Sequence, residues 1–160
     1  MKNKISLLIF SCILVFSSCL GEGDDPFIDA KNNIKEGEKF LIENAKKEGV
    51  VTTQSGLQYK ILNKTDGKTP NINSIVECNY EGRFINGDIF DSSYKRGESA
   101  EFRVDGVIKG WTEALMLMHK GEKWQLYVPY HLAYGTRNQQ GIGPCKTLIF
   151  DVELLEIKDK

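Results

Sequence analysis

The sequence has little of what nucleophilic or metal-dependent catalysis usually needs. It contains two histidines, His119 and His131, and neither has a carboxylate or cysteine partner at a recognisable motif spacing. No HExxH, GxSxG or glycine-rich phosphate-binding motif is present. A lone histidine is more often a surface or capping residue than a base. We therefore expect no nucleophile, no metal site and no cofactor.

Cysteine is also scarce, with four in 160 residues. Cys12 and Cys19 belong to the N-terminal segment, which leaves Cys78 and Cys145 for the folded part. Their spacing matches no CxxC or zinc pattern, and two thiols far apart in sequence do not define a disulfide without geometry. An oxidising compartment would permit a bridge between them. The bridged and the free state therefore both stay open.

The chain also has no large excess of charge of either sign. The chain carries 21 basic and 22 acidic residues, a formal net charge of -1, with no long run of one sign. Partners with a phosphate backbone usually meet a basic patch, so we expect no nucleic acid partner. With 41% hydrophobic and 27% charged residues the composition is globular, and 160 residues have room for one domain with a short extension.

An apolar run at the N-terminus, residues 5–16, follows two lysines and is too short to span a bilayer. It predicts a signal peptide over residues 1–18. The letters "VFSSC", ending at Cys19, resemble the lipobox of bacterial lipoproteins, in which the chain is cut before the cysteine and the thiol carries lipid. Phe16 stands where leucine is usual. We expect an exported, membrane-anchored lipoprotein of a bacterial cell envelope, on the periplasmic or surface side; the alternative is plain secretion.

Two segments of different character follow the signal peptide. Residues 19–28 are polar and rich in glycine and aspartate, which predicts a flexible tether. From Asp29 to Lys47 apolar residues share one helical face, which predicts an amphipathic helix in an N-terminal extension, residues 29–51. Gly37 weakens its middle. The helix could pack on its own domain or fray in solvent, or it could act as a dimerisation or substrate-gripping arm; we favour a packed or frayed helix over an arm, and a monomer over a dimer.

The remainder, residues 52–160, alternates apolar and polar side chains as β-strands do. The apolar sets are Leu57, Tyr59 and Ile61; Val76, Cys78 and Tyr80; Phe102 and Val104; Trp124, Leu126 and Val128; and Leu148, Phe150, Val152 and Leu154. Apolar residues at every second position, with polar residues between them, indicate an antiparallel sheet with one solvated face. Trp111, Leu115 and Met118 form one helical stripe. We predict an α+β fold, with an antiparallel sheet wrapped around one short central α-helix.

Aromatic and aliphatic residues gather beside the expected turns. The segments "FDSS", "VIKGW" and "AYG" each place an aromatic residue next to a turn glycine or an acid, where a site is more usual than a core interior. Concave apolar pockets with a few placed polar groups bind small apolar ligands or side chains. Any one of these residues alone would be assigned to the core, but together they predict a pocket. They are Tyr80, Phe90, Phe102, Val107, Ile108, Trp111, Tyr134 and Phe150.

The segments "YEGRFINGDIFDSSYKRGE", "FRVDGVIKGWTEALMLMHKGEKWQLYVP", "LAYG" and "TLIFDVELLEI" together resemble the FKBP family of peptidyl-prolyl cis-trans isomerases, over roughly Thr52 to Ile157. The upstream "ENAKKEGVVTTQSGLQYKIL" is similar to the lead-in of bacterial members like the macrophage infectivity potentiator. The resemblance implies a strongly twisted sheet and an enzyme that accelerates rotation about X-Pro bonds in exported proteins. It implies two kinds of partner: proline-containing polypeptides and rapamycin-type macrocycles.

The resemblance also implies the roles of the site residues. Trp111 floors a pocket for the substrate proline, and the other aromatic residues form its walls. The catalytic set is Asp91, Phe90, Trp111 and Tyr134, and the substrate-binding set is Tyr80, Phe102, Val107, Ile108, Ile142 and Phe150. Asp91 and Tyr134 form the polar lining, and the Ile108 amide donates to the bound peptide. Arg96 could pair with Asp91 and shape the turn.

One segment departs from the family pattern. Where the family commonly has "IPPN" before the last strand, this chain has "GIGPC", residues 141–145, after a loop that is one residue short. Ile142 is the best candidate for the family's loop isoleucine. The departure bears on residue preference and inhibitor affinity rather than on catalysis. The alternative function is a chaperone module that binds proline peptides with little turnover.

Overall fold

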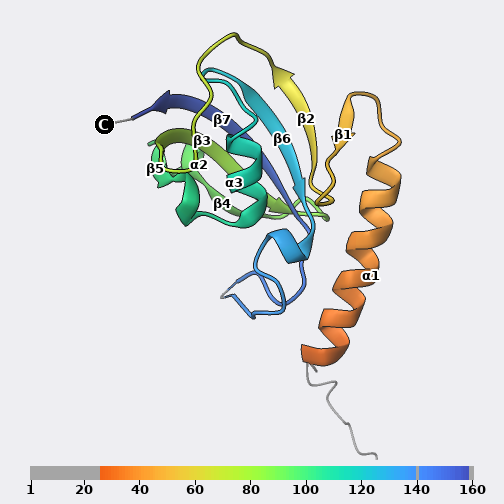
Figure 1. The fold of residues 1–160 in the computed structure, drawn as a ribbon. Helices are drawn as coiled ribbons and strands as arrows, with labels where there is room; N and C mark the ends of the chain where they lie inside the picture. Colours follow the sequence, from red (N-terminus) through yellow and green to blue (C-terminus); the bar gives the residue numbers. More distant parts are fainter. Residues whose placement is uncertain (1–25, 140, 159–160) are drawn as a thin grey trace, which may run out of the picture.

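A seven-stranded antiparallel sheet forms the frame of the fold (Figure 1). The computed structural model describes residues 26–139 and 141–158. Its strands are β1 (Val50–Thr52), β2 (Gln58–Asn63), β3 (Ile75–Phe84), β4 (Ile89–Ser92), β5 (Ala100–Arg103), β6 (Lys123–Val128) and β7 (Leu148–Ile157). The order is β1-β2-β6-β7-β3, and both β4 and β5 pair with β3. The predicted antiparallel sheet is confirmed, although the alternation pattern did not reveal β1 and β4.

Strand β3 organises the site because two short strands share its free edge. Strand β5 pairs with the first part of β3, from Ile75 to Cys78, and β4 pairs with Glu81 to Arg83. The helical turn α2 (Ser93–Arg96) joins them. Ser92 caps its N-terminus, accepting a hydrogen bond from the amide of Lys95, and Gly97 ends it in the left-handed region at φ 78°. This turn carries Arg96 back toward the end of β4.

Helix α3 (Lys109–Leu115) is the predicted central helix, and the twisted sheet curves behind it in Figure 1. Trp111 and Leu115 are buried, as the helical stripe predicted. Met118 is also fully buried, but it lies in the loop after the helix. The inward positions of β3, β6 and β7 alternate in burial, which places the core between α3 and one face of the sheet.

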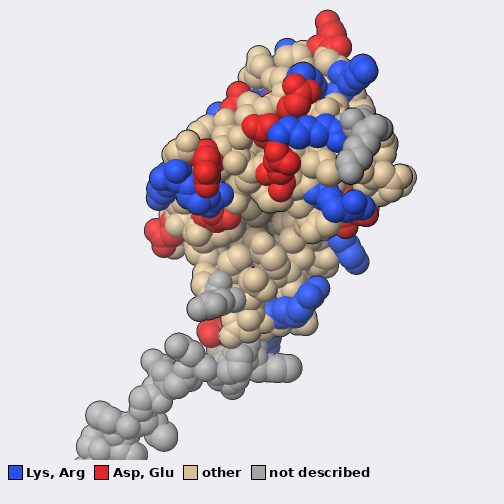
Figure 2. All heavy atoms as spheres, turned by 90° about the vertical axis from the view of Figure 1, so that its left-hand side faces the viewer, with Lys and Arg blue, Asp and Glu red and all other residues tan. Residues whose placement is uncertain are grey.

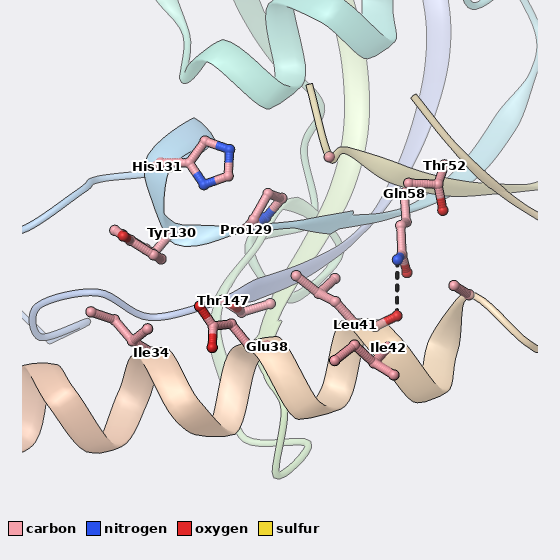
Figure 3. A pocket seen from close by; sticks show the side chains of 12 residues that line it. Ile34, Glu38, Leu41, Ile42, Thr52, Gln58, Pro129, Tyr130, His131 and Thr147 are labelled. Carbon is pink, nitrogen blue, oxygen red and sulfur yellow. Dashed lines mark hydrogen bonds between the residues drawn. The ribbon is translucent and has the colours of Figure 1, made fainter. Parts of the chain in front are cut away.

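Helix α1 (Pro26–Asn44) packs on its own domain. It begins three residues before the predicted Asp29 and ends at Asn44, before the predicted Lys47. The side chain of Gln58 in β2 donates a 2.9 Å hydrogen bond to the Leu41 carbonyl (Figure 3) and accepts one of 2.9 Å from Asn44. Both Gln58 and Asn44 are buried. The packing interpretation of this helix is therefore confirmed.

Gly37 has a role in this packing that the sequence did not show. A Cβ atom at this position would lie 2.2 Å from Oγ1 of Thr147, which precedes β7. A glycine inside a helix costs about 1 kcal/mol relative to alanine, but here it lets the helix approach the domain closely. Gly37 therefore weakens the helix and at the same time permits its docking.

The remaining features of the chain concern its cysteines, membrane-spanning helices, metal sites and N-terminal segment. Cys78 and Cys145 are both buried and are not bonded to each other. Among residues 26–139 and 141–158, no helix is long and apolar enough to cross a membrane, and no group of acidic, histidine or cysteine side chains could hold a metal ion. The predicted signal peptide, Cys19 and most of the tether lie outside the described residues.

Candidate active site

A pocket of about 260 Å³ opens at the end of α3, between the helix and the edge of the sheet. It is lined by all the pocket residues predicted from sequence except Ile142, and by Gly106. These residues come from strands β3, β4, β5 and β7, from α3, and from the loops before α3 and after the turn η2 (Tyr130–Leu132). Side chains far apart in sequence therefore converge on one small volume.

Trp111 lies at the base of this pocket, with only 4% of its surface exposed. Its ring meets those of Tyr80, Phe102 and Phe150 edge-on, at centroid distances of 5.3, 5.4 and 5.4 Å. Phe90 in turn meets Phe150 edge-on at 5.7 Å. Edge-to-face contacts are a favoured geometry for aromatic pairs. The rings therefore hold one another in a fixed cage.

Gly82 makes room for two of these rings, and the sequence analysis did not single it out. A Cβ atom on Gly82 would lie 2.6 Å from Phe90 and 2.8 Å from Phe150. The signal was present, because position 82 continues the inward series of Val76, Cys78 and Tyr80 with no side chain. A glycine inside a strand often marks a close approach. Here the approaching groups are the walls of the pocket.

The polar side of the pocket is a closed network of three side chains. The Tyr80 hydroxyl donates a 2.6 Å hydrogen bond to the Asp91 carboxylate. The Arg96 guanidinium pairs with the other carboxylate oxygen of Asp91 and donates to the Tyr80 hydroxyl at 2.9 Å. The guanidinium also lies over the Tyr80 ring, 5.5 Å from its centroid. The expected pairing of Asp91 with Arg96 is thus confirmed.

This network fixes the protonation states of the site. Burial alone would raise the pKa of Asp91, but hydrogen bonds from Tyr80 and Arg96, with the Arg96 charge, hold that pKa below its usual 3.8. Burial, with the hydrogen bond to Asp91, raises the pKa of Tyr80 above 10.0. Burial, with the Asp91 charge, raises the pKa of Tyr134 as well. At neutral pH the pocket thus has one carboxylate and two neutral phenols.

Comparison with known proteins decides the family. Residues 66–155 match the model of FKBP-type peptidyl-prolyl cis-trans isomerases, and residues 28–61 match the model of the domain amino-terminal to these isomerases. The chain belongs to the FKBP family. The FKBP-type 22 kDa peptidyl-prolyl cis-trans isomerase of Escherichia coli is 54% identical over 123 residues, which are 76% of this chain and 60% of that protein. The isomerase Mip of Coxiella burnetii is 50% identical over 80% of this chain and 56% of its own length.

Solved structures agree with this assignment of the fold. FkpA from Escherichia coli superposes with a TM-score of 0.81 at 44% identity, covering 83% of this chain and 62% of that one. An isomerase from Pseudomonas syringae superposes at 0.76 with 34% identity, covering 81% of this chain and 96% of its own. The present chain spans about half to three fifths of the length of the curated relatives.

Ile142 does not line the pocket of this FKBP domain. It lines a neighbouring hollow of about 420 Å³, which shares Phe90, Asp91 and Tyr134 with the pocket. The loop around it has unusual backbone geometry, with positive φ at Gly141, Gly143 and the non-glycine Cys145. The departure from the family pattern in "GIGPC" therefore coincides with an isoleucine that lines the neighbouring hollow instead of the aromatic pocket.

A larger hollow, about 510 Å³, lies between α1 and the domain (Figure 3). It is lined largely by aliphatic residues of α1, such as Ile34 and Leu41, and by residues 129–131 around η2. It shares no lining residue with the aromatic pocket. Its walls have no convergent network like that of Tyr80, Asp91 and Arg96. The aromatic pocket is therefore the better candidate for a catalytic site.

Proposed function

We propose that this protein is a peptidyl-prolyl cis-trans isomerase that accelerates X-Pro bond rotation in exported polypeptides. The observation that carries the proposal is the cage of aromatic rings around Trp111, closed on one side by the Tyr80, Asp91 and Arg96 network. Its volume of about 260 Å³ has room for a single proline ring with its flanking bonds.

The chemistry needs no nucleophile. An X-Pro bond rotates slowly because partial double-bond character gives a barrier of about 20 kcal/mol. That character weakens as the amide twists, and the twisted amide is less polar than the planar one. A pocket that grips the proline ring in apolar surroundings therefore favours the twisted state. A thousandfold acceleration requires only about 4 kcal/mol of differential binding.

Each part of the site has a role in this scheme. Trp111, Phe102 and Phe150 surround the proline ring. Phe90, Asp91 and Tyr134 stand at the side where the carbonyl of residue X rotates. Hydrogen bonds from Tyr80 and Arg96 hold the pKa of Asp91 below 3.8, so Asp91 acts on that carbonyl as a fixed charge and not as a proton acceptor.

Exchange NMR on the full chain tests this proposal. We expect fast cis-trans exchange in a tetrapeptide with a bulky apolar residue before proline, and a rapamycin-type macrocycle should block it. Phe90→Ala should lower the rate more than tenfold while the protein stays folded; Tyr94→Ala removes an exposed aromatic side chain outside the pocket and should not. A folded protein that binds the peptide without turnover would instead support the chaperone module. Wild-type turnover in Phe90→Ala would refute the assignment of the pocket.

We propose further that lipid on Cys19 anchors the protein to a bacterial envelope membrane. The signal-like residues 1–18 and the small residues before Cys19 support this, and one matched relative is named outer membrane protein MIP, from Legionella longbeachae. Several acyl chains on one cysteine hold a protein firmly, since each buried methylene contributes about 0.8 kcal/mol. Mass spectrometry of protein from a bacterial membrane fraction should show an acylated N-terminal Cys19. An unmodified N-terminus would contradict the anchor.

A further inference from the structure

Three hollows join end to end on one side of the domain. The aromatic pocket and the second hollow, around Ile142, share Phe90, Asp91 and Tyr134. The second hollow and a third, of about 440 Å³, share Phe84, Gly141 and Ile142. The third reaches helix α1 at Asn33 and Glu36. The three form one groove that starts at the aromatic pocket and ends at the N-terminal extension.

The second hollow has an apolar wall. Phe84 and Phe90 are in ring contact at 5.0 Å, which extends the aromatic surface beyond the pocket. Ile89 is 38% exposed beside them, and Ile142 is half-buried on the opposite loop. An apolar side chain placed here would cover Ile89 and remove apolar surface from water. The second hollow thus offers one apolar wall to a Leu-like or aromatic side chain, beside the polar side chains of Asp91 and Gln139.

A hydrogen bond between α1 and the loop after Ile142 borders the third hollow, and charged side chains without ion-pair partners among the described residues line it. The Asn33 amide donates a 2.9 Å hydrogen bond to the Pro144 carbonyl, which ties α1 to the loop after Ile142. Two acids, Glu36 and Asp88, and one base, Lys146, line it. Within residues 26–139 and 141–158, none of these three side chains forms an ion pair. The excess of acid favours a basic side chain here.

The face of the molecule on the side of the aromatic pocket carries few charges over part of its surface (Figure 2). Figure 2 faces the side of the molecule on which β4, β5 and α2 lie. Charged side chains gather over the upper part of this face, and the lower part is largely uncharged, with a hollow where the two parts meet. An extended polypeptide can lie along such a surface without desolvating many charges.

We propose that this groove binds the segment on the N-terminal side of the substrate proline, and that α1 forms its far end. The direction of the peptide along the groove follows from the proposed function, on which this inference rests. In that function the carbonyl of residue X lies beside Phe90, Asp91 and Tyr134. The residues before X then enter the second hollow with an apolar side chain and the third with a basic one. The N-terminal helix thereby contributes to substrate choice through Glu36.

Exchange NMR on the full chain with three peptides tests the groove. All share one X-Pro core; one is a tetrapeptide, one carries six extra residues on the N-terminal side, with Leu near X and Lys at the far end, and one carries the same residues on the C-terminal side. Six extended residues reach about 20 Å. We expect the N-terminal extension to raise kcat/KM about tenfold, mainly through KM. Equal values for the tetrapeptide and the N-terminal extension, or a gain confined to the C-terminal one, would overturn the proposal.

Two variants of α1 make the test specific. Glu36→Lys should lower kcat/KM for the N-terminally extended peptide by a factor of about three to five. It should leave kcat/KM for the tetrapeptide unchanged. Glu38→Lys makes the same charge change on the same helix, but Glu38 lines the hollow between α1 and the domain instead, so the gain should persist. If both variants act alike, Glu36 does not contact the peptide and the inference fails. If the wild-type chain turns over no peptide, the proposed function fails. Peptide affinities measured from chemical shifts would still show whether the N-terminal extension binds in the groove.

Discussion

The Tyr80 hydroxyl lies 2.6 Å from the Asp91 carboxylate and donates its proton there, while Arg96 contacts both side chains. The contact joins the middle of β3 to β4, and both residues line the aromatic pocket. It leaves Asp91 ionised and already hydrogen-bonded, which suits a group that stabilises a rotating carbonyl. It does not suit a general base.

Tyr80→Phe tests this relationship. The variant removes one hydrogen bond to Asp91 and the acceptor for Arg96, so we expect the pKa of Asp91 to rise toward 3.8 and the isomerase rate to fall about threefold to tenfold. Carbon NMR of the Asp91 carboxyl and exchange NMR of a peptide measure the two effects. An unchanged Asp91 pKa would show that the hydrogen bond contributes nothing to its ionisation.

The same network predicts the pH dependence of the site. Because the folded-state pKa of Asp91 lies below its unfolded value, its stabilising contribution is complete above about pH 4 to 5 and is lost as the pH falls through the folded pKa. Isomerase activity should therefore not depend on Asp91 ionisation between about pH 5 and 8. An acidic limb near pH 6 that disappears in Asp91→Asn would contradict this.

Gly37→Ala should destabilise the docking of α1, although alanine is the better helix former. The new methyl group would collide with Thr147, and overpacking of this kind costs about 1 to 3 kcal/mol. Thermal unfolding measures the change, with Lys35→Ala on the exposed face as the control. Adding Thr147→Ala should restore part of the loss. If Gly37→Ala alone raised the free energy of unfolding by about 1 kcal/mol, helix propensity would outweigh the collision with Thr147.

Gln58→Leu should release the C-terminal half of α1. Gln58 hydrogen-bonds both the Leu41 carbonyl and the Asn44 amide. The Leu41 carbonyl also accepts from the Ala45 amide, so the substitution leaves the buried Asn44 amide unpaired, at a cost of about 1 to 3 kcal/mol. Hydrogen exchange should accelerate in α1 and stay slow in β3 and β7. Gln54→Leu, at an exposed position, is the matched control. Uniform acceleration through the whole domain would mean that α1 and the sheet unfold together.

The two buried thiols should be inert in the native protein. Burial, with the Glu77 charge, raises the pKa of Cys78 to about 12, and burial raises the pKa of Cys145. Both therefore stay protonated at neutral pH and are poor nucleophiles. Iodoacetamide with peptide mapping should label them only as the chain unfolds. Fast labelling of either thiol, or a Cys78 to Cys145 bridge in protein from an oxidising compartment, would contradict the structure.

The sequence predicted those features that local patterns encode. Alternation identified the long strands, and the motifs around Phe90, Trp111 and Tyr134 indicated the pocket. The role of Gly37 was not predictable, because it depends on Thr147 from a distant segment. For Gly82 the alternation in β3 marked an inward position without a side chain, but it did not show that the Phe90 and Phe150 rings fill the space. The position of Ile142 was not predictable either, since it depends on the backbone of a loop that departs from the family pattern.

The indole N–H of Trp111 reports directly on whether the aromatic pocket is occupied during turnover. Its nitrogen is buried and has no hydrogen-bond partner among the described residues, so its NMR signal should respond when a proline ring enters the pocket. We expect a saturable shift of this signal, with a midpoint close to the KM for X-Pro exchange in the same sample. Turnover that leaves the Trp111 signal unchanged would place the reaction elsewhere and contradict the account.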